Sequence, residues 1–193
     1  PYRFETEEDA HAFLQNCKEA SYKIKAVEKK PISKLPAPPF TTSTLQQEAG
    51  RKLGFSVSNT MRIAQQLYES GKITYMRTDS VNLSQFALMS AKKEIENLYG
   101  TEYVKNRQFS TKSKGAQEAH EAIRPTDVTK TPVMLKDKLS RDQLRLYQLI
   151  WKRFVASRMQ PAKYETTTVK IGAGKHKFTV NTSNIKFEGF RAV

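Results

Sequence analysis

The sequence has little cysteine and no long apolar segment. Its one cysteine is Cys17, which excludes an internal disulfide and a cysteine-rich zinc site. Cys17 lies on the apolar face of a predicted helix, so we expect it to be a small core residue. No apolar run has the length of a transmembrane helix, and no secretory signal pattern is present. The sequence therefore indicates a chain that folds around its own core and has no membrane partner.

Acidic residues are the scarcer charged class. There are 19 Asp and Glu residues against 33 Lys and Arg residues, which gives a formal net charge of +14. This excess favours an anionic partner, because basic side chains neutralise phosphates and release counterions. Membrane surfaces are also anionic, but the basic residues are spread over predicted strands and loops rather than along one amphipathic helix. Nucleic acid is therefore the favoured partner.

The segment GKITYMRTDS, residues 71–80, places a phenol, a guanidinium, two threonine hydroxyls and a carboxylate close together. We predict a strand from Ile73 to Arg77, in which Ile73, Tyr75 and Arg77 would share one face. A phenol has a pKa near ~10 and is a poor nucleophile unless its anion is stabilised. A neighbouring arginine provides this stabilisation, and its planar fork fits phosphate oxygens. The pair suits attack on a phosphate, although an ordinary strand with a packed tyrosine has the same pattern.

A second group of polar residues lies in the segment AQEAHEAIRPT, residues 116–126. His120 and Arg124 are four residues apart and would share one face of a helical turn, although Pro125 disfavours helix at Arg124. Acidic neighbours of His120 could suggest a metal site. The ligand spacing of such sites is absent, so we predict no metal here. The end of a surface helix remains the alternative interpretation.

Hydrophobic periodicity predicts a helical middle between β-rich ends. Two short helices and then the strand with Tyr75 have the outline of a helix-turn-helix with a wing. The segment Gly172–Lys175 lacks the full phosphate-loop pattern, so we predict a hairpin turn there. The predicted fold class is α+β: a mainly helical, winged-helix-like domain inserted into part of a β-rich domain. A first helix is predicted from a cap at residues 6–9 to Cys17, and the further predicted helices span 41–53, 57–70, 83–99 and 141–159. The predicted strands span 21–27, 164–171, 178–180 and 185–187, and residues 29–39 form an extended connection.

Residues 71–80 resemble the active-site motif of type IA DNA topoisomerases, in the bacterial topoisomerase I branch. Two further segments match the same family in the same order: PPFTTSTLQQEA, residues 38–49, and the segment 116–126. The residues of the segment 116–126 favour bacterial topoisomerase I over topoisomerase III. Reverse gyrase would need a helicase domain that this sequence does not show. The resemblance covers nearly the whole chain and implies an excised central part of a longer protein.

The resemblance implies an enzyme, an isomerase that needs no ATP. Tyr75 would attack a phosphodiester of single-stranded DNA and form a 5′-phosphotyrosine intermediate, allowing strand passage, religation and relaxation of negatively supercoiled DNA. Arg77 would stabilise charge on the phosphate or the phenolate, a contribution that can be worth roughly a hundredfold in rate. His120 would hold the scissile phosphate. Arg124 would bind the DNA backbone.

Other expectations follow from the same resemblance. Lys72, Thr74 and Lys114 are expected to contact DNA, and Thr78 and Asp79 to support the site. The expected domains are residues 1–34 and 161–193 of a β-rich arch and residues 35–160 of the tyrosine domain.

Several partners are expected from the family as well. Magnesium would bind a Toprim domain absent from this sequence, so we expect no metal in this chain and no relaxation by the chain alone. The Toprim and gate domains of its own chain would be partners of a cytoplasmic monomer acting at the bacterial nucleoid. The alternative is a non-catalytic winged-helix DNA-binding module, which would form no covalent adduct with DNA.

Overall fold

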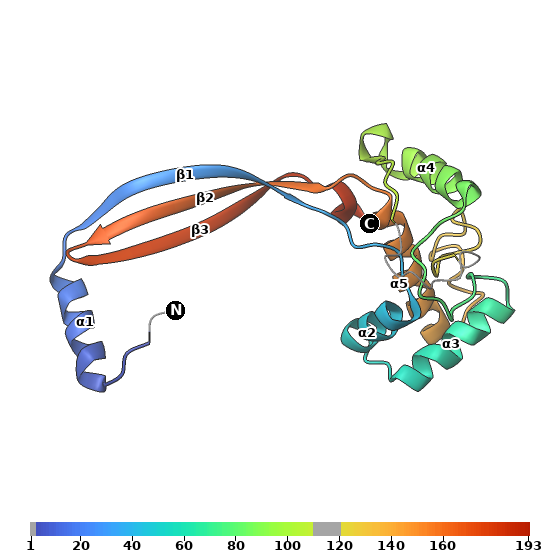
Figure 1. Ribbon diagram of the computed structural model, residues 1–193, viewed down its shortest axis with the longest axis horizontal. Coiled ribbons are helices and arrows are strands. Elements are labelled where there is room, and N and C mark those ends of the chain that lie inside the picture. Colours follow the sequence, from blue (N-terminus) through green and yellow to red (C-terminus); the bar gives the residue numbers. More distant parts are fainter. Residues whose placement is uncertain (1–2, 110–120) are drawn as a thin grey trace. The chain divides into compact units, whose positions relative to one another are not determined.

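The structure, a computed structural model, describes residues 3–109 and 121–193, and its contacts divide the chain into two compact units (Figure 1). The sheet unit contains Pro1–Ser33 and Lys163–Phe187. The helical unit contains Lys34–Ala162 and Glu188–Val193, so the last residues belong with the helices rather than with the predicted return segment of the sheet. No helix in the described part of the chain is long and apolar enough to cross a membrane.

The sheet unit combines one helix with three long strands. Helix α1 spans Glu7–Glu19, and the strands are β1 (Tyr22–Lys34), β2 (Ala162–Ala173) and β3 (His176–Phe187), in the spatial order β1-β2-β3. β2 and β3 pair antiparallel and are joined by a tight turn. Gly174 occupies this turn with a φ of 56°, a conformation that glycine adopts without strain. The predicted hairpin turn is therefore confirmed.

Strand β1 is longer than the sequence predicts. It continues to Lys34 through Pro31, so the extended connection predicted from residue 29 begins only after the strand. Proline has no backbone N–H and is tolerated in a strand at the edge of a sheet. β1 is such an edge strand, which explains why the proline did not end it.

The described part of the helical unit contains four α-helices, each started by a hydroxyl side chain: α2 (Thr42–Leu53), α3 (Val57–Glu69), α4 (Gln85–Tyr99) and α5 (Arg141–Ser157). Ser140 and Gln143 form the predicted capping box of α5. The predicted cap of α4 at Ser80 or Asn82 is wrong. Its cap is Ser84, whose hydroxyl accepts from the Ala87 amide at 3.3 Å.

The core of the described residues lies around α5. Its apolar face packs against α2 and α3 and is almost fully buried. The polar atoms of its large aromatic residues find backbone partners: Trp151 Nε1 donates to the Val128 carbonyl at 2.8 Å, and the Tyr147 hydroxyl donates to the Lys130 carbonyl at 2.6 Å. The largest buried side chains that pack in this core include Phe40, Leu45, Ile63, Leu67, Tyr147, Ile150 and Phe154.

The predicted wing strand is not formed. Ile73 makes only an isolated antiparallel bridge with Pro125, and the following residues up to Ser84 are irregular. The reason is that the backbone of this segment bonds to Thr42 and Arg124 instead of to a neighbouring strand. The α+β class and the paired helices α2 and α3 are confirmed, whereas the winged-helix detail is not.

Candidate active site

Thr42, the first residue of α2, holds the middle of the tyrosine motif. Its hydroxyl donates to the Met76 carbonyl at 2.8 Å and accepts from the Thr78 amide at 2.9 Å. Its own amide donates to the Thr78 carbonyl at 2.9 Å. The backbone on the C-terminal side of Tyr75 is therefore fixed to the start of a helix that is itself anchored in the core.

Thr74 holds the motif on the other side of Tyr75. Its hydroxyl donates to the Ala122 carbonyl at 2.7 Å and accepts from the Arg124 amide at 3.0 Å. The Thr74 amide donates to the Arg124 carbonyl at 2.9 Å. The DNA contact that the resemblance implies for Thr74 stays a prediction; in the structure its half-buried hydroxyl joins two segments of the chain.

These bonds bring together the three segments that carry the family resemblance. Residues 71–78 bond to residues 122–126 on one side and to Thr42 on the other. The Ile123 amide donates to the Phe40 carbonyl at 2.8 Å, which joins the segment 38–49 to the segment 116–126. The Thr126 amide adds a 3.1 Å bond to the Lys72 carbonyl. Segments far apart in the sequence thus form one framework around Tyr75.

The side chains of the motif alternate between buried and exposed positions. Met76, Thr78 and Ser80 are buried. Tyr75, Arg77 and Asp79 are exposed, and 40% of the Tyr75 surface is accessible to solvent. The prediction that Tyr75 and Arg77 share one face agrees with this pattern, whereas Ile73 is buried and does not share it.

The ring of Tyr75 lies edge-to-face with the ring of Tyr68, which belongs to the last turns of α3. The ring centroids are 5.3 Å apart and the planes are inclined at 67°. This geometry is favourable for an aromatic pair and restricts the ring orientation of Tyr75. From the sequence we expect no role for Tyr68 beyond packing, because it lies on the apolar stripe of the helix.

Arg124 is buried as deeply as Thr78 among the predicted site residues that the structure describes, with 8% of its surface exposed. Its guanidinium lies 2.6 Å from the Glu121 carboxylate and also donates to the Pro125 carbonyl at 2.9 Å. Burial opposes ionisation of Glu121, but bonds from Ser84 and Arg124 and the charge of Arg124 outweigh it and lower the pKa of Glu121. The DNA contact predicted for Arg124 stays a prediction, while its described contacts fasten the framework.

The other predicted site residues differ in burial and in hydrogen bonding. The Thr78 hydroxyl accepts from the Ser80 amide at 3.0 Å, which supports the predicted structural role. Lys72 is half-buried and Asp79 is exposed. His120 and Lys114 lie outside the described residues. Within the described ranges no three acidic, histidine or cysteine residues gather into a possible metal site.

Comparison with known proteins identifies the family. A family model described as DNA topoisomerase matches residues 1–193. The chain belongs to this family.

The relatives specify the branch. The chain is 50% identical over 186 residues to DNA topoisomerase 1 of Zymomonas mobilis, which is 94% of this chain and 15% of that protein. It is also similar to the solved structure of full-length topoisomerase I from Thermotoga maritima, with a TM-score of 0.85 and 40% identity, over 100% of this chain and 32% of that one. The resemblance to bacterial, type IA topoisomerase I is thereby confirmed, and the chain spans a minor part of these relatives.

Proposed function

We propose that this chain supplies the nucleophile of a type IA DNA topoisomerase, and that the nucleophile is Tyr75. The observation that carries the proposal is an exposed phenol on a backbone fixed on both sides by buried or half-buried threonines. A nucleophile gains from such positioning, because the reacting atoms need not be ordered at the moment of attack. Family membership makes DNA the natural substrate of this arrangement.

The reaction is a transesterification. The Tyr75 oxygen loses its proton and forms a bond to phosphorus, while the bond from phosphorus to the 3′ oxygen breaks. The leaving oxygen takes up a proton and becomes a 3′-hydroxyl, and the 5′ phosphate stays on the tyrosine. The reverse attack reseals the strand, and no nucleotide cofactor is consumed because the number of phosphodiester-type bonds is conserved. In the whole protein this cycle would permit strand passage and relaxation of negatively supercoiled DNA.

Charge on the phosphate needs cationic or hydrogen-bonding partners. Arg77 is exposed two residues from Tyr75 and would supply a permanent cation. His120 is proposed to bind the scissile phosphate, and Lys72, Lys114 and Arg124 to contact the strand. Magnesium, which we place on a Toprim domain of the whole protein, would supply further charge neutralisation.

The partner domains and the supporting residues are also proposed from the family membership. The Toprim and gate domains would be the partners of this chain within a monomer that works on DNA in the cytoplasm. Asp79 and Thr78 would support the site without touching DNA.

The decisive experiment measures whether the label of a cleaved oligonucleotide becomes covalently attached to the protein. A protein joining this chain to the Toprim part is incubated with magnesium and a 3′-labelled single-stranded oligonucleotide, and then denatured. We expect label to migrate with the wild-type protein and with Tyr68→Phe, and to be lost entirely in Tyr75→Phe, since only Tyr75 would carry the 5′ phosphate. Oligonucleotide binding without any adduct in the wild type would instead favour a non-catalytic binding module.

A further inference from the structure

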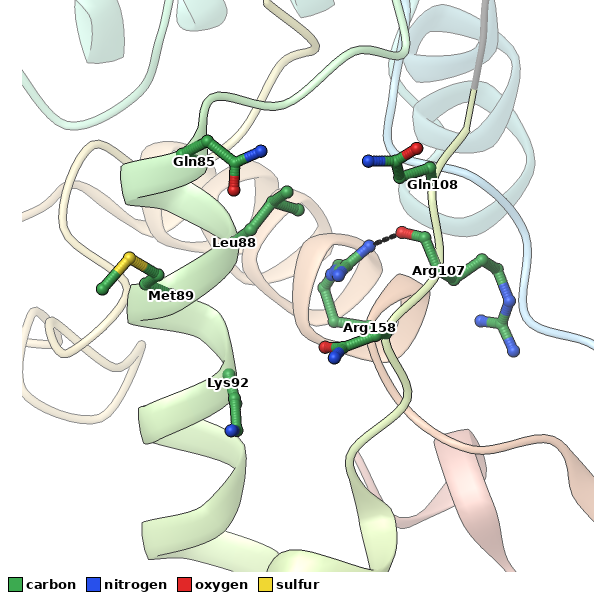
Figure 2. Close-up of a pocket in the computed structure, with 8 residues that line it drawn as sticks. Gln85, Leu88, Met89, Lys92, Arg107, Gln108 and Arg158 are labelled. Carbon is green, nitrogen blue, oxygen red and sulfur yellow. Dashed lines mark hydrogen bonds between the residues drawn. The ribbon is translucent and has the colours of Figure 1, made fainter.

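A groove of about 570 Å³ lies within the helical unit, between α4 and residues 106–108 (Figure 2). Lys92 and Gln85 of α4 contribute polar groups, Leu88 and Met89 contribute apolar surface, and Arg158 lines it from the end of α5. A second hollow of about 270 Å³ shares several of these residues and reaches residues 81–83, which directly follow the tyrosine motif. The proposed function assigns no role to this surface.

Arg158 is held firmly at the base of the groove. Its side chain extends between Leu88 and the segment with Gln108, and its guanidinium donates to the Arg107 carbonyl (Figure 2). The side chain of Arg107 points away and caps the end of α5, donating to the carbonyls of Ser157 at 3.0 Å and Met159 at 3.3 Å. The Lys105 amide adds a 3.0 Å bond to the Arg158 carbonyl. The guanidinium is thus positioned before any ligand arrives.

The charge of Arg158 lacks a counterion in the part of the chain that the structure describes. Only 5% of the residue is exposed, no acidic side chain lines the groove, and none of the described ion pairs includes Arg158 or Arg107. Burial lowers the pKa of Arg158, and the nearby charge of Arg107 lowers it further. A buried cation without a carboxylate is unfavourable until an anion pairs with it.

The lining of the groove indicates which anion fits. The planar fork of an arginine matches phosphate oxygens, and Lys92 at the groove adds a second cation. Met89, which is 70% exposed, and Leu88 present apolar surface beside these charges. Single-stranded nucleic acid offers both a phosphate and an open base face, whereas a duplex hides its base faces.

We propose that this groove binds a phosphate of single-stranded DNA between Arg158 and Lys92, with a neighbouring base against Leu88 and Met89. The inference rests on the proposed function for the identity of the polymer. The groove would add a DNA contact on α4. The adjoining hollow reaches residues 81–83, which directly follow the tyrosine motif. The groove would hold the strand beside the site of cleavage without taking part in the reaction.

Two neighbouring lysines of α4 provide a matched test. Both lysines are exposed, but only Lys92 lines the groove. Binding of a fluorescein-labelled single-stranded oligonucleotide is measured by anisotropy at several salt concentrations, in the protein that joins this chain to the Toprim part. We expect Lys92→Gln to raise the Kd about 3–10-fold and to reduce the salt slope by about 0.7, the value for one lost phosphate contact on a single strand. Lys93→Gln should leave the Kd within about twofold.

Arg158 gives the second arm of the test. Arg158→Gln should raise the Kd by about tenfold or more, because a charge-assisted phosphate contact is lost, and Arg158→Lys should restore part of it. A thermal melt of each variant shows whether the fold is retained. A folded Arg158→Gln variant with wild-type affinity, equal Kd values for the two lysine variants, or no oligonucleotide binding by the wild type would each overturn the proposal.

The two proposals fail separately. Absence of the covalent adduct in the wild type would reject Tyr75 as the nucleophile. Equal affinities of Lys92→Gln and Lys93→Gln would reject the groove, whatever the adduct yield.

Discussion

The two units of this chain are built on different principles. The helical unit buries a continuous cluster of aromatic and aliphatic side chains around α5. In the sheet unit β1 is exposed along nearly its whole length, and Tyr22, Ile24 and Val27 all remain accessible. A unit with its own core fixes its side chains by packing, whereas a thin sheet depends mainly on strand pairing. The candidate site lies on the helical unit, where the framework around Tyr75 is anchored to the packed core.

The largest expected effect contrasts one side chain from each unit. Phe154→Ala should destabilise the helical unit by about 3–5 kcal/mol, because it removes a fully buried ring from the core. Ile24→Ala, at an exposed position of β1, should change stability by less than about 0.5 kcal/mol. Urea unfolding of both variants measures the contrast. Comparable losses would show that the sheet unit is as dependent on side-chain packing as the helical unit.

An intermediate effect is expected where the framework holds the motif. Thr42→Val keeps the shape of the side chain but removes the hydroxyl that bonds Met76 and Thr78. We expect a loss of about 1–3 kcal/mol in stability, because the Met76 carbonyl and the Thr78 amide lose their partner. The adduct yield in the label-transfer assay should fall as well. Ser43→Ala, at the adjacent exposed position of α2, is the control and should leave both quantities near wild type.

The smallest expected effect is a pH-dependent change in stability at the buried carboxyl of Glu94. Burial raises the pKa of Glu94, and the charge of Asp127 raises it further. Because the folded-state pKa lies above the unfolded value, the stabilising contribution of the protonated form is complete below the ordinary value of 4.5 and is lost as the pH rises through the folded pKa. Glu94→Gln should therefore raise the melting temperature by about 2–4 °C at neutral pH, the shift that ~1 kcal/mol gives in a domain of this size.

The control for this prediction is Glu96→Gln, since Glu96 is less buried and lies on the same helix. The gain from Glu94→Gln should shrink toward about pH 4, where the wild-type carboxyl is protonated in both states. A gain of the same size at both pH values would contradict a raised pKa for Glu94.

Local sequence signals predicted those elements whose determinants are local. The capping box at Ser140 and Gln143 and the apolar stripe that follows it were enough to predict α5. The incomplete phosphate-loop pattern of Gly172–Lys175, between two predicted strands, was enough to predict the hairpin turn. The strand predicted from Ile73 to Arg77 was wrong for the opposite reason. Residues 75–80 alternate in exposure as a strand does, but the segment bonds through Thr74 to Arg124 and through Met76 and Thr78 to Thr42, which are distant in sequence and do not form a ladder.

In the candidate site, too, features of a contiguous motif could be predicted, whereas contacts between distant residues could not. The shared exposed face of Tyr75 and Arg77 could be predicted because the motif that contains them is contiguous. The functions of Thr42 and Thr74 could not, because each depends on a partner tens of residues away. The burial of Arg124 could not be predicted either: the resemblance implies a DNA contact, which stays a prediction, and only the fold reveals that the guanidinium is buried against Glu121.

The hydroxyl of Thr74 has a consequence for how this position can vary. It donates to one backbone group and accepts from another, so a side chain there must do both at once. Serine satisfies the requirement; valine and alanine satisfy neither bond. A library of all substitutions at residue 74, selected for function, should therefore be enriched in two residues only, and mutational tolerance at this site would follow hydrogen-bond capacity rather than size or polarity.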